Sequence, residues 1–276
     1  MVRRGAARAR QLITHPGSEA SEFASTADLI VNRDKPPFNN PDLRRAMALS
    51  FDREAFIDIL IEGEGDIGGV MQQPPAGLWG MPPELLQALT GYDPDVQKNR
   101  AEARQVMQKL GYGPDSRLKI KVSVRDLPYL RDPAVIMIDQ MKQVYIDGDL
   151  ERSILRIGFR RSCARITSSA SPAPEVGPTP TRISNCFYGC GGELNYNGYC
   201  SPEADKRIDR QSSEADQEKR KRLVWEIERK LAEDGARPII FYGRRATCWE
   251  PRVKGLTLMV NSIFNGWRME DVWLDN

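Results

Sequence analysis

The residue types that most often do chemistry are scarce in this sequence of 276 residues. It contains a single histidine, His15, in a polar N-terminal stretch. A serine or cysteine nucleophile needs a nearby base, most often histidine, and zinc sites recruit several histidines or cysteines. No Gly-x-Ser-x-Gly turn of the α/β-hydrolase type occurs either. The sequence therefore predicts no catalytic residue, no metal site and no cofactor, and we expect a protein that is not an enzyme.

The cysteines leave two alternatives open. None of them forms a Cys-x-x-Cys pair, and they stand at Cys163, Cys186, Cys190, Cys200 and Cys248. Cys190 and Cys200 flank a turn-rich loop, so in an oxidising compartment they could close a short disulfide loop. The other alternative is two free, small side chains. Metal binding by this pair is a poor third, because thiolate sites normally recruit more ligands than this loop offers.

Charge is distributed unevenly along the chain. The formal net charge is +2. Residues 152–187 hold six arginines and one acid, Glu175, and residues 1–24 hold four arginines and two glutamates, so all other residues together carry −5. We therefore expect no nucleic-acid partner. No apolar run approaches the roughly 20 residues of a membrane span, and residues 1–11 lack the apolar core of a secretory signal.

The secondary-structure elements that could position a functional site begin in residues 29–80. An extended segment, residues 29–33, precedes a helix start in which Asn40 caps, Pro41 takes the first helical position and Asp42 suits the positive end of the dipole. A second helix start follows at Ser50 or Asp52. Glycines 63 and 65 stop that helix, and a Pro-rich loop then leads to residues 78–80, Leu-Trp-Gly.

Further along the chain the pattern predicts alternating helices and strands. Asn99 is expected to cap a helix that Gly111 ends in a left-handed conformation. Residues 118–124 alternate apolar and polar side chains, which indicates a half-buried strand, and the next helix is expected to start at 132–133. Helices are predicted from Ser201 and Asp216, and a buried strand over 237–242. This order favours an α/β lobe.

Several segments resemble one known family, in the family's order. Residues 39–56, NNPDLRRAMALSFDREAF, are similar to the NPxVRxALxxaiDR signature of extracytoplasmic solute-binding proteins of family 5, the receptors of ABC importers for peptides and nickel. Residues 74–80, 92–95, 101–112, 195–205 and 253–273 match further motifs of the family. The resemblance covers roughly residues 28–276, with one interruption.

The resemblance implies a fold and a domain organisation. We expect an α/β fold: a periplasmic-binding-protein-like lobe, with a mixed sheet and flanking helices, plus closing strands of a second lobe that is mostly missing. Residues 1–27 are predicted to be disordered or foreign. Residues 28–252 form the smaller lobe, and residues 253–276 return to the larger one. Because a family member carries a signal peptide and an N-terminal half, we expect this chain to be N-terminally incomplete.

The resemblance also implies a function and a set of site residues. We expect a monomeric, extracytoplasmic or periplasmic protein that captures a peptide or similar small solute in a cleft between two lobes, works with ABC permease subunits and has no membrane span. The positions that match the family's cleft are Asn32, Arg33, Trp79, Asn195, Tyr196 and Tyr199. For Trp79 core packing is an equal alternative, and for Asn195 and Tyr196 a turn-stabilising role is the stronger one. Relatives often carry a cysteine pair near Cys190 and Cys200, which favours the disulfide.

Residues 152–187 interrupt the resemblance. They show no sustained periodicity, contain no aspartate and hold four prolines among serines and threonines, so composition alone predicts a flexible linker. The family places a strand and a Gly-x-x-Asp-Pro-Asp loop here. Back-translation of residues 162–171 in an offset frame can read Leu-Arg-Lys-Asp-Tyr-Ile-Val-Gly-Leu, and residues 178–184 can read Asp-Ala-Asp-Pro-Asn-Phe. We therefore hypothesise a reading-frame slip across 152–187.

The interruption supports an alternative to solute capture. Peptide-binding relatives commonly place an aspartate from the disrupted loop against the ligand's amino group, and Glu175 is the only acid left here. Loss of one partner of a buried charged hydrogen bond costs about 2–5 kcal/mol. The alternative is a truncated, frame-disrupted fragment without ligand binding, with exposed apolar patches and poor solubility.

Overall fold

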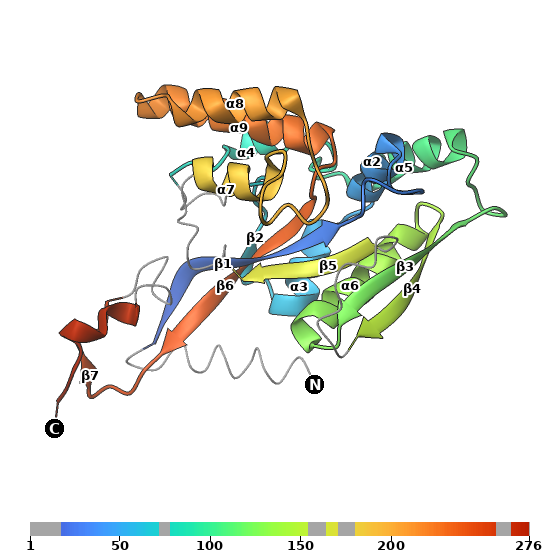
Figure 1. Ribbon diagram of the computed structural model, residues 1–276. Coiled ribbons are helices and arrows are strands. Elements are labelled where there is room, and N and C mark those ends of the chain that lie inside the picture. The colour runs from blue at the N-terminus through green and yellow to red at the C-terminus, as the bar shows by residue number, and fades with distance from the viewer. Residues whose placement is uncertain (1–17, 72–77, 154–163, 171–179, 258–265, 276) are drawn as a thin grey trace.

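A computed structural model describes residues 18–71, 78–153, 164–170, 180–257 and 266–275. Within these residues the chain folds around a six-stranded sheet of order β2-β6-β1-β5-β3-β4, and β7 and β8 form a separate pair (Figure 1). The strands are β1 (Ser18–Ile30), β2 (Gly65–Asp66), β3 (Leu118–Arg125), β4 (Ile146–Ser153), β5 (Ala164–Ala170), β6 (Ile239–Cys248), β7 (Val253–Lys254) and β8 (Trp273–Leu274). The helices are α2 (Pro41–Leu49), α3 (Arg53–Ile61), α4 (Pro83–Leu86), α5 (Val96–Lys109), α6 (Pro128–Lys142), α7 (Pro180–Tyr188), α8 (Pro202–Ser212), α9 (Gln217–Glu233) and the 3₁₀ turn η2 (Gly266–Asp271).

Four helices begin at capping residues that the sequence predicts. The side chains of Asn40, Asp52, Ser201 and Asp216 accept hydrogen bonds from backbone N–H groups in the first turns of α2, α3, α8 and α9. Each cap satisfies a donor that has no partner inside the helix and is worth about 1 kcal/mol. Gly111 follows α5 with a φ of +87°, the left-handed stop predicted there. These local predictions are confirmed.

Two helices begin earlier than predicted. The side chain of Asp95 caps α5, which starts at Val96, so Asn99 lies inside the first turn and is buried. α6 starts at Pro128, and Pro133, the predicted start, lies inside the helix. In both cases another residue that can begin a helix stands four or five positions upstream, Asp95 before α5 and Pro128 in α6, and the helix begins there.

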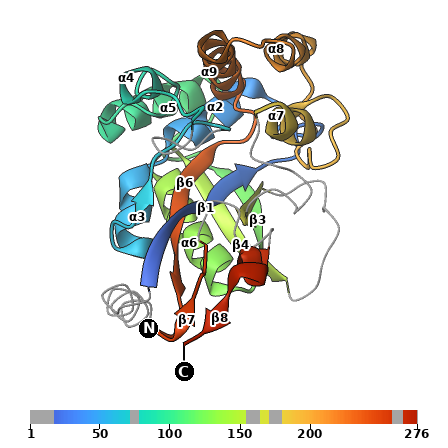
Figure 2. The same cartoon turned by 90° about the vertical axis from the view of Figure 1, so that its left-hand side faces the viewer.

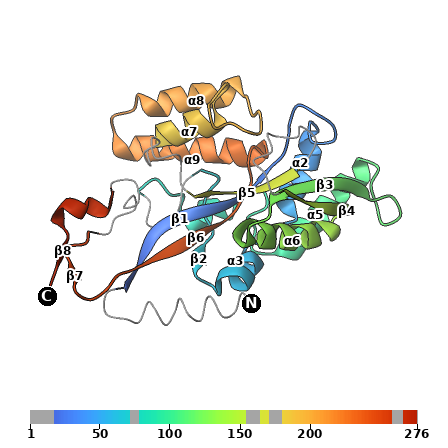
Figure 3. The same ribbon diagram turned by 60° about the horizontal axis from the view of Figure 1, so that its bottom comes forward.

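The apolar residues form two cores. The first lies between the sheet and helices α2, α3, α5 and α6, and its fully buried members include Leu29, Phe56, Val122 and Met137. The second lies among α4, α7, α8 and α9 and the loops that join them. Figure 3 shows α7, α8 and α9 gathered together, away from α3 and α6. The mixed sheet with flanking helices is the fold class that the resemblance implied, and that prediction is confirmed.

Strands β1 and β6 extend beyond the helices. They have 13 and 10 residues and pair antiparallel, with Ser18 opposite Cys248 and Asp28 opposite Ile239. Figures 1 and 2 show the pair reaching toward β7, β8 and the C-terminus. The residues that follow Ile30 therefore lie at the other end of β1, beside the helices.

Two stretches have more backbone structure than their composition predicts. β1 begins at Ser18, inside the segment 1–27 that was expected to be disordered. Within the segment 152–187, read as a linker, β5 pairs with β1 antiparallel and with β3 parallel, and α7 begins at Pro180. The linker and disorder predictions therefore do not hold for 18–27, 164–170 and 180–187. In the two strands the backbone pairs with neighbouring strands, and such hydrogen bonds do not depend on side-chain composition. Residues 1–17, 154–163 and 171–179, with His15, Cys163 and Glu175, lie outside the described residues.

Candidate functional site

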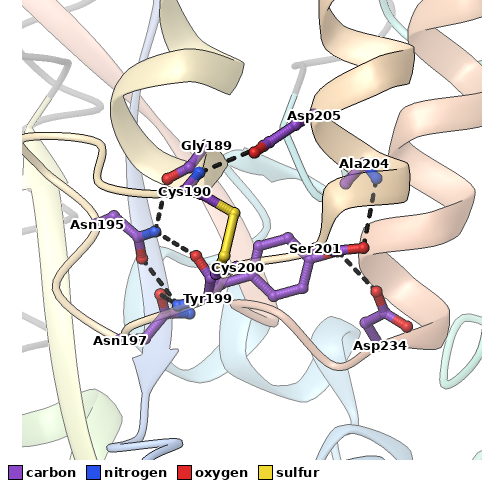
Figure 4. The surroundings of a disulfide bond; sticks show 10 residues. All are labelled: Gly189, Cys190, Asn195, Asn197, Tyr199, Cys200, Ser201, Ala204, Asp205 and Asp234. Atoms are coloured by element: carbon purple, nitrogen blue, oxygen red, sulfur yellow. Dashed lines mark hydrogen bonds between the residues drawn. A yellow bond between two sulfur atoms is a disulfide. The ribbon is translucent and has the colours of Figure 1, made fainter.

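The loop that joins α7 to α8 carries three of the six predicted site residues. Cys190 and Cys200 are joined by a disulfide across it, with their Cα atoms 4.4 Å apart (Figure 4). The backbone N–H of Cys190 also donates to the carboxylate of Asp205 in α8 at 3.3 Å. Among the described cysteines, Cys186 and Cys248 are thiols. Of the two alternatives for Cys190 and Cys200, a disulfide or two free thiols, the structure contains the disulfide.

Asn195 organises the interior of this loop. Its side-chain amide donates to the carbonyl oxygens of Gly189 and Tyr199, at 2.9 and 2.5 Å, and its side-chain oxygen accepts from the N–H of Tyr199 at 3.1 Å (Figure 4). Asn197 is buried and its amide donates to the carbonyl of Ala236. These bonds use the Asn195 side chain inside the loop, which is the turn-stabilising role that the sequence favoured.

Tyr199 and Arg33 meet at the C-terminal end of α9. The Tyr199 hydroxyl donates to the carboxylate of Asp234 at 2.6 Å, and the Arg33 guanidinium lies 4.7 Å from the centre of the Tyr199 ring. Arg33 also donates to the carbonyl oxygens of Asp234 and Gly235, at 3.3 and 3.2 Å. A cation at a helix C-terminus interacts favourably with the helix dipole. Three segments far apart in the sequence are tied together here.

Burial shapes the acid–base properties of this pair. Desolvation, and then the charge of Arg44, lower the pKa of Arg33 to about 10, against partial compensation from Tyr199 and Asp234. Desolvation, and then the hydrogen bond to Asp234, raise the pKa of Tyr199. Both groups therefore keep their ordinary charge at neutral pH, positive and neutral, and the contact is a cation over a neutral ring.

Asn32 shapes the turn after β1. Its side-chain oxygen accepts from the N–H of Asp34 at 3.0 Å, an arrangement typical of an Asx turn. The N–H of the next residue, Arg33, donates to the carbonyl of Asn197 at 3.4 Å, which holds this turn against the α7–α8 loop. The sequence matched Asn32 and Arg33 to a strand end beside the cleft, and they lie directly after the end of β1.

Trp79 lies elsewhere on the lobe. It is half-buried against the second core, its ring faces the guanidinium of Arg220 at 4.9 Å, and its carbonyl accepts from the indole of Trp225 at 3.0 Å. Along α9, Trp225 and Asp234 are nine residues apart, roughly 14 Å at the helical rise. The structure therefore brings Arg33, Asn195 and Tyr199 together, whereas the contacts of Trp79 are with the other half of α9.

Tyr196 is the most exposed of the predicted site residues. Its side chain is 50% exposed, whereas Tyr199 is buried at 1%. An exposed tyrosine on a rigid, disulfide-closed loop offers a flat apolar face and a polar tip to a ligand.

The sequence did not single out the residues that fix the start of the Pro-rich loop. The hydroxyl groups of Tyr242 and Tyr188 donate to the carbonyl oxygens of Gly69 and Val70, at 2.8 and 2.7 Å. The carboxylate of Glu228 accepts from the N–H of Met71 at 3.0 Å. A Cβ on Gly69 would stand 2.3 Å from that carboxylate, so a larger residue there would have to displace the Glu228 side chain. The sequence offered one signal for this contact: Glu228 is an acidic residue on the apolar face of the helix predicted from Asp216.

Neither a metal centre nor a membrane segment emerges from the part of the chain that the structure describes. In those residues no three histidine, cysteine or acidic side chains gather as metal ligands. The helices of the same residues include none with the length and apolarity to cross a membrane.

Similar structures define the class of protein to which this lobe belongs. Haemophilus influenzae OppA, solved in complex with RPPGFSPFR, superimposes with a TM-score of 0.76 at 18% identity, over 99% of this chain and 52% of that one. Helicobacter pylori DppA, in complex with the peptide STSA, gives 0.71 at 17% identity, over 100% and 54%. Staphylococcus aureus NikA, in complex with Ni(L-His)2, gives 0.70 at 17% identity, over 94% and 54%. The fold is that of a lobe of such binding proteins.

The family follows from the sequence itself. Residues 8–153, more than half of the chain, match the family model for bacterial extracellular solute-binding proteins, family 5 Middle. The chain belongs to family 5 of the bacterial extracellular solute-binding proteins, which are binding proteins of ABC importers and not enzymes. The match starts inside the segment 1–27 that was read as foreign, so that reading does not hold from residue 8 onward. A search of curated proteins finds no match.

The chain spans about half the length of the solved structures it matches. The family match ends at residue 153, next to the point where the resemblance was predicted to break off.

Proposed function

We propose that this chain supplies the smaller lobe of an ABC-importer receptor that captures a peptide or similar small solute between two lobes. Family membership carries the proposal. The long β1–β6 pair, which extends past the helices toward β7 and β8, supports it, because strands that cross between two lobes can act as a hinge. Residues 28–252 would form this lobe and residues 253–276 would return to the larger one, in an extracytoplasmic monomer.

We further propose a division of labour among the six site residues. Tyr196, Asn32 and Trp79 keep exposed or half-exposed surface and would contact the solute. The polar groups of Arg33, Asn195 and Tyr199 form hydrogen bonds within the α7–α8 loop and with the end of α9, so these residues would position that loop. The disulfide Cys190–Cys200 would keep this loop closed in an oxidising compartment.

The test is calorimetric titration with trialanine of the protein that the complete gene encodes, with the gene first resequenced from about codon 145 to codon 195 and upstream of Met1. Tyr196→Ala is expected to weaken binding about tenfold, the loss of one aromatic contact. Tyr129→Ala is the matched control, since Tyr129 is 59% exposed on α6. Equal affinities for the two variants would remove Tyr196 from the site.

The second candidate is a frame-disrupted fragment that binds no solute. It is favoured by the single acid, Glu175, between residues 152 and 187, where peptide-binding relatives place an aspartate. The absence of heat with trialanine, longer peptides and a nickel–histidine complex would support this candidate and contradict solute capture, whereas a compact, soluble monomer by gel filtration would count against the exposed apolar patches that the fragment predicts.

A further inference from the structure

Three arginines are buried among the described residues, Arg44, Arg53 and Arg237, and the surroundings of the last two differ. Arg237 and Arg53 are 6% and 5% exposed. The Nε of Arg237 donates to the carboxylate of Asp28 at 2.5 Å. Arg53 donates to backbone carbonyl oxygens, from Nε to Ile239 at 3.1 Å and from Nη1 to Gly91. Within the described residues no carboxylate forms an ion pair with Arg53.

An unpaired charge inside a protein is strongly unfavourable, because water no longer stabilises it. Desolvation lowers the pKa of Arg53, and the only group that counteracts this is Tyr92. The carboxylate of Glu228, which acts on Tyr92, accepts from the N–H of Met71 at 3.0 Å and does not pair with Arg53. The guanidinium nevertheless keeps its proton at neutral pH. A negative partner is therefore the missing element of this site.

Tyr92 adds a second polar group, whose hydrogen-bond donor is unused. Its ring centre lies 3.8 Å from the Arg53 guanidinium carbon, and its side chain is 8% exposed. Its hydroxyl oxygen lies close enough to the Arg53 guanidinium to raise the pKa of Arg53 as a hydrogen-bond partner, but the hydroxyl donates to no group among the described residues. Buried hydroxyl groups nearly always have a partner, so such an exception calls for an explanation.

Both residues line the same small cavity. Its other walls come from α2, the loop before Tyr92, the C-terminal end of α9 and the start of β6, and they include Ala48, Leu231 and Pro238. The space is partly open to its surroundings and is small, with room for about one water molecule or monatomic ion. The cavity thus combines an unpaired cation and a free hydroxyl donor within a mostly apolar wall.

We propose that this cavity binds one small monovalent anion of the size of chloride, held by the Arg53 guanidinium and the Tyr92 hydroxyl. Chloride accepts hydrogen bonds from both groups and balances the charge, whereas a water molecule leaves the charge unbalanced. Sulfate, phosphate and carboxylates are too large for the space. The proposal does not depend on which solute the protein binds. The anion would lie inside the core and do for Arg53 what the carboxylate of Asp28 does for Arg237.

The test compares melting temperatures of the chain in sodium chloride and in sodium gluconate at equal ionic strength, since gluconate cannot enter the cavity. Chloride at about ten times its dissociation constant is expected to raise the melting temperature by about 2–4 °C. Tyr92→Phe is expected to lose most of this rise. Tyr188→Phe is the matched control: the Tyr188 hydroxyl donates to Val70 at 2.7 Å, so this variant melts lower in both salts and keeps the chloride-dependent rise.

Two results would overturn the proposal. One is an equal melting temperature of the wild-type chain in both salts, and the other is a chloride-dependent rise that Tyr92→Phe retains in full. Without an anion, Tyr92→Phe only removes an unpaired hydroxyl, which leaves stability unchanged or raises it in both salts. Crystals soaked in bromide give an independent readout: an anomalous peak between Arg53 and Tyr92 supports the site, and peaks at the surface only contradict it.

Discussion

Strands β3 and β5 are neighbours in one sheet, but their sequences differ in kind. β3 reads LKIKVSVR, and its residues alternate between buried and exposed from Leu118 to Arg125. β5 reads ARITSSA, contains one large apolar residue and is bordered by β1 and β3. A strand between two partners normally offers apolar side chains to at least one face. β3 meets this requirement by its own sequence, whereas the sequence of β5, which is paired on both sides, has Ile166 as its one large apolar residue.

The difference sharpens the hypothesis of a reading-frame slip. The offset reading of residues 162–171 ends in Tyr-Ile-Val-Gly-Leu, and these residues would fall on the second half of β5. That string has the β-branched and aromatic residues typical of an interior strand. A strand of mostly small and polar residues specifies its register only weakly, whereas the offset string would specify it through its apolar side chains.

The largest effect is expected at Asp28, the β1 residue that pairs with Thr167 of β5. Asp28→Asn leaves Arg237 buried without its carboxylate, which costs about 3–5 kcal/mol in the free energy of unfolding. Urea denaturation followed by circular dichroism measures it. Asp28→Leu combined with Arg237→Met removes both charges and is expected to recover much of the loss. A single variant as stable as the wild type would show that β1 is not packed as described.

A smaller effect is expected in β3. Ile120→Ala removes a side chain that is 6% exposed in the first core, at a cost of about 2–4 kcal/mol by the same denaturation experiment. Lys119→Ala, one position away on the exposed face, is the control and is expected to change stability by less than about 0.5 kcal/mol. Similar costs for the two variants would contradict the alternation on which the comparison rests.

The smallest effect, and the most specific to β5, is a gain. The register pairs Ser168 with Ala27, which is 4% exposed. Ser168→Val is expected to stabilise the chain by about 1 kcal/mol. Thr167→Val is the control, because Thr167 is opposite the charged Asp28 and a valine there gains nothing. If Ser168→Val instead destabilises the chain, β5 is not missing an apolar residue at this position, and the reading-frame hypothesis loses its structural support.

Local features could be predicted from the sequence because they depend on neighbours along the chain. The caps at Asn40, Asp52, Ser201 and Asp216, the left-handed stop at Gly111 and the alternation of β3 are of this kind. The family motif over residues 39–56 is a local feature too, because it contains the caps of two consecutive helices, α2 and α3. The start of α6 at Pro128 was missed because several residues could begin that helix.

The roles of the site residues could not be predicted in the same way. Arg33 is 201 residues from Asp234 in the sequence, yet its guanidinium lies at that end of α9 and over the ring of Tyr199. Whether a side chain faces a solute or holds a loop depends on partners that are distant in the sequence. Patterns of neighbouring residues do not reveal such partners.

The sequence by itself determined the family, the α/β class and the starts of α2, α3, α8 and α9, since these follow from motif order, hydrophobic period and capping chemistry. Only the tertiary structure decided that β5 lies between β1 and β3, that Arg237 has a carboxylate partner and that Arg53 has none among the residues the structure describes. The physical reason is that strand pairing and charge compensation join residues far apart in the chain, and burial fixes their energies only once the cores have formed.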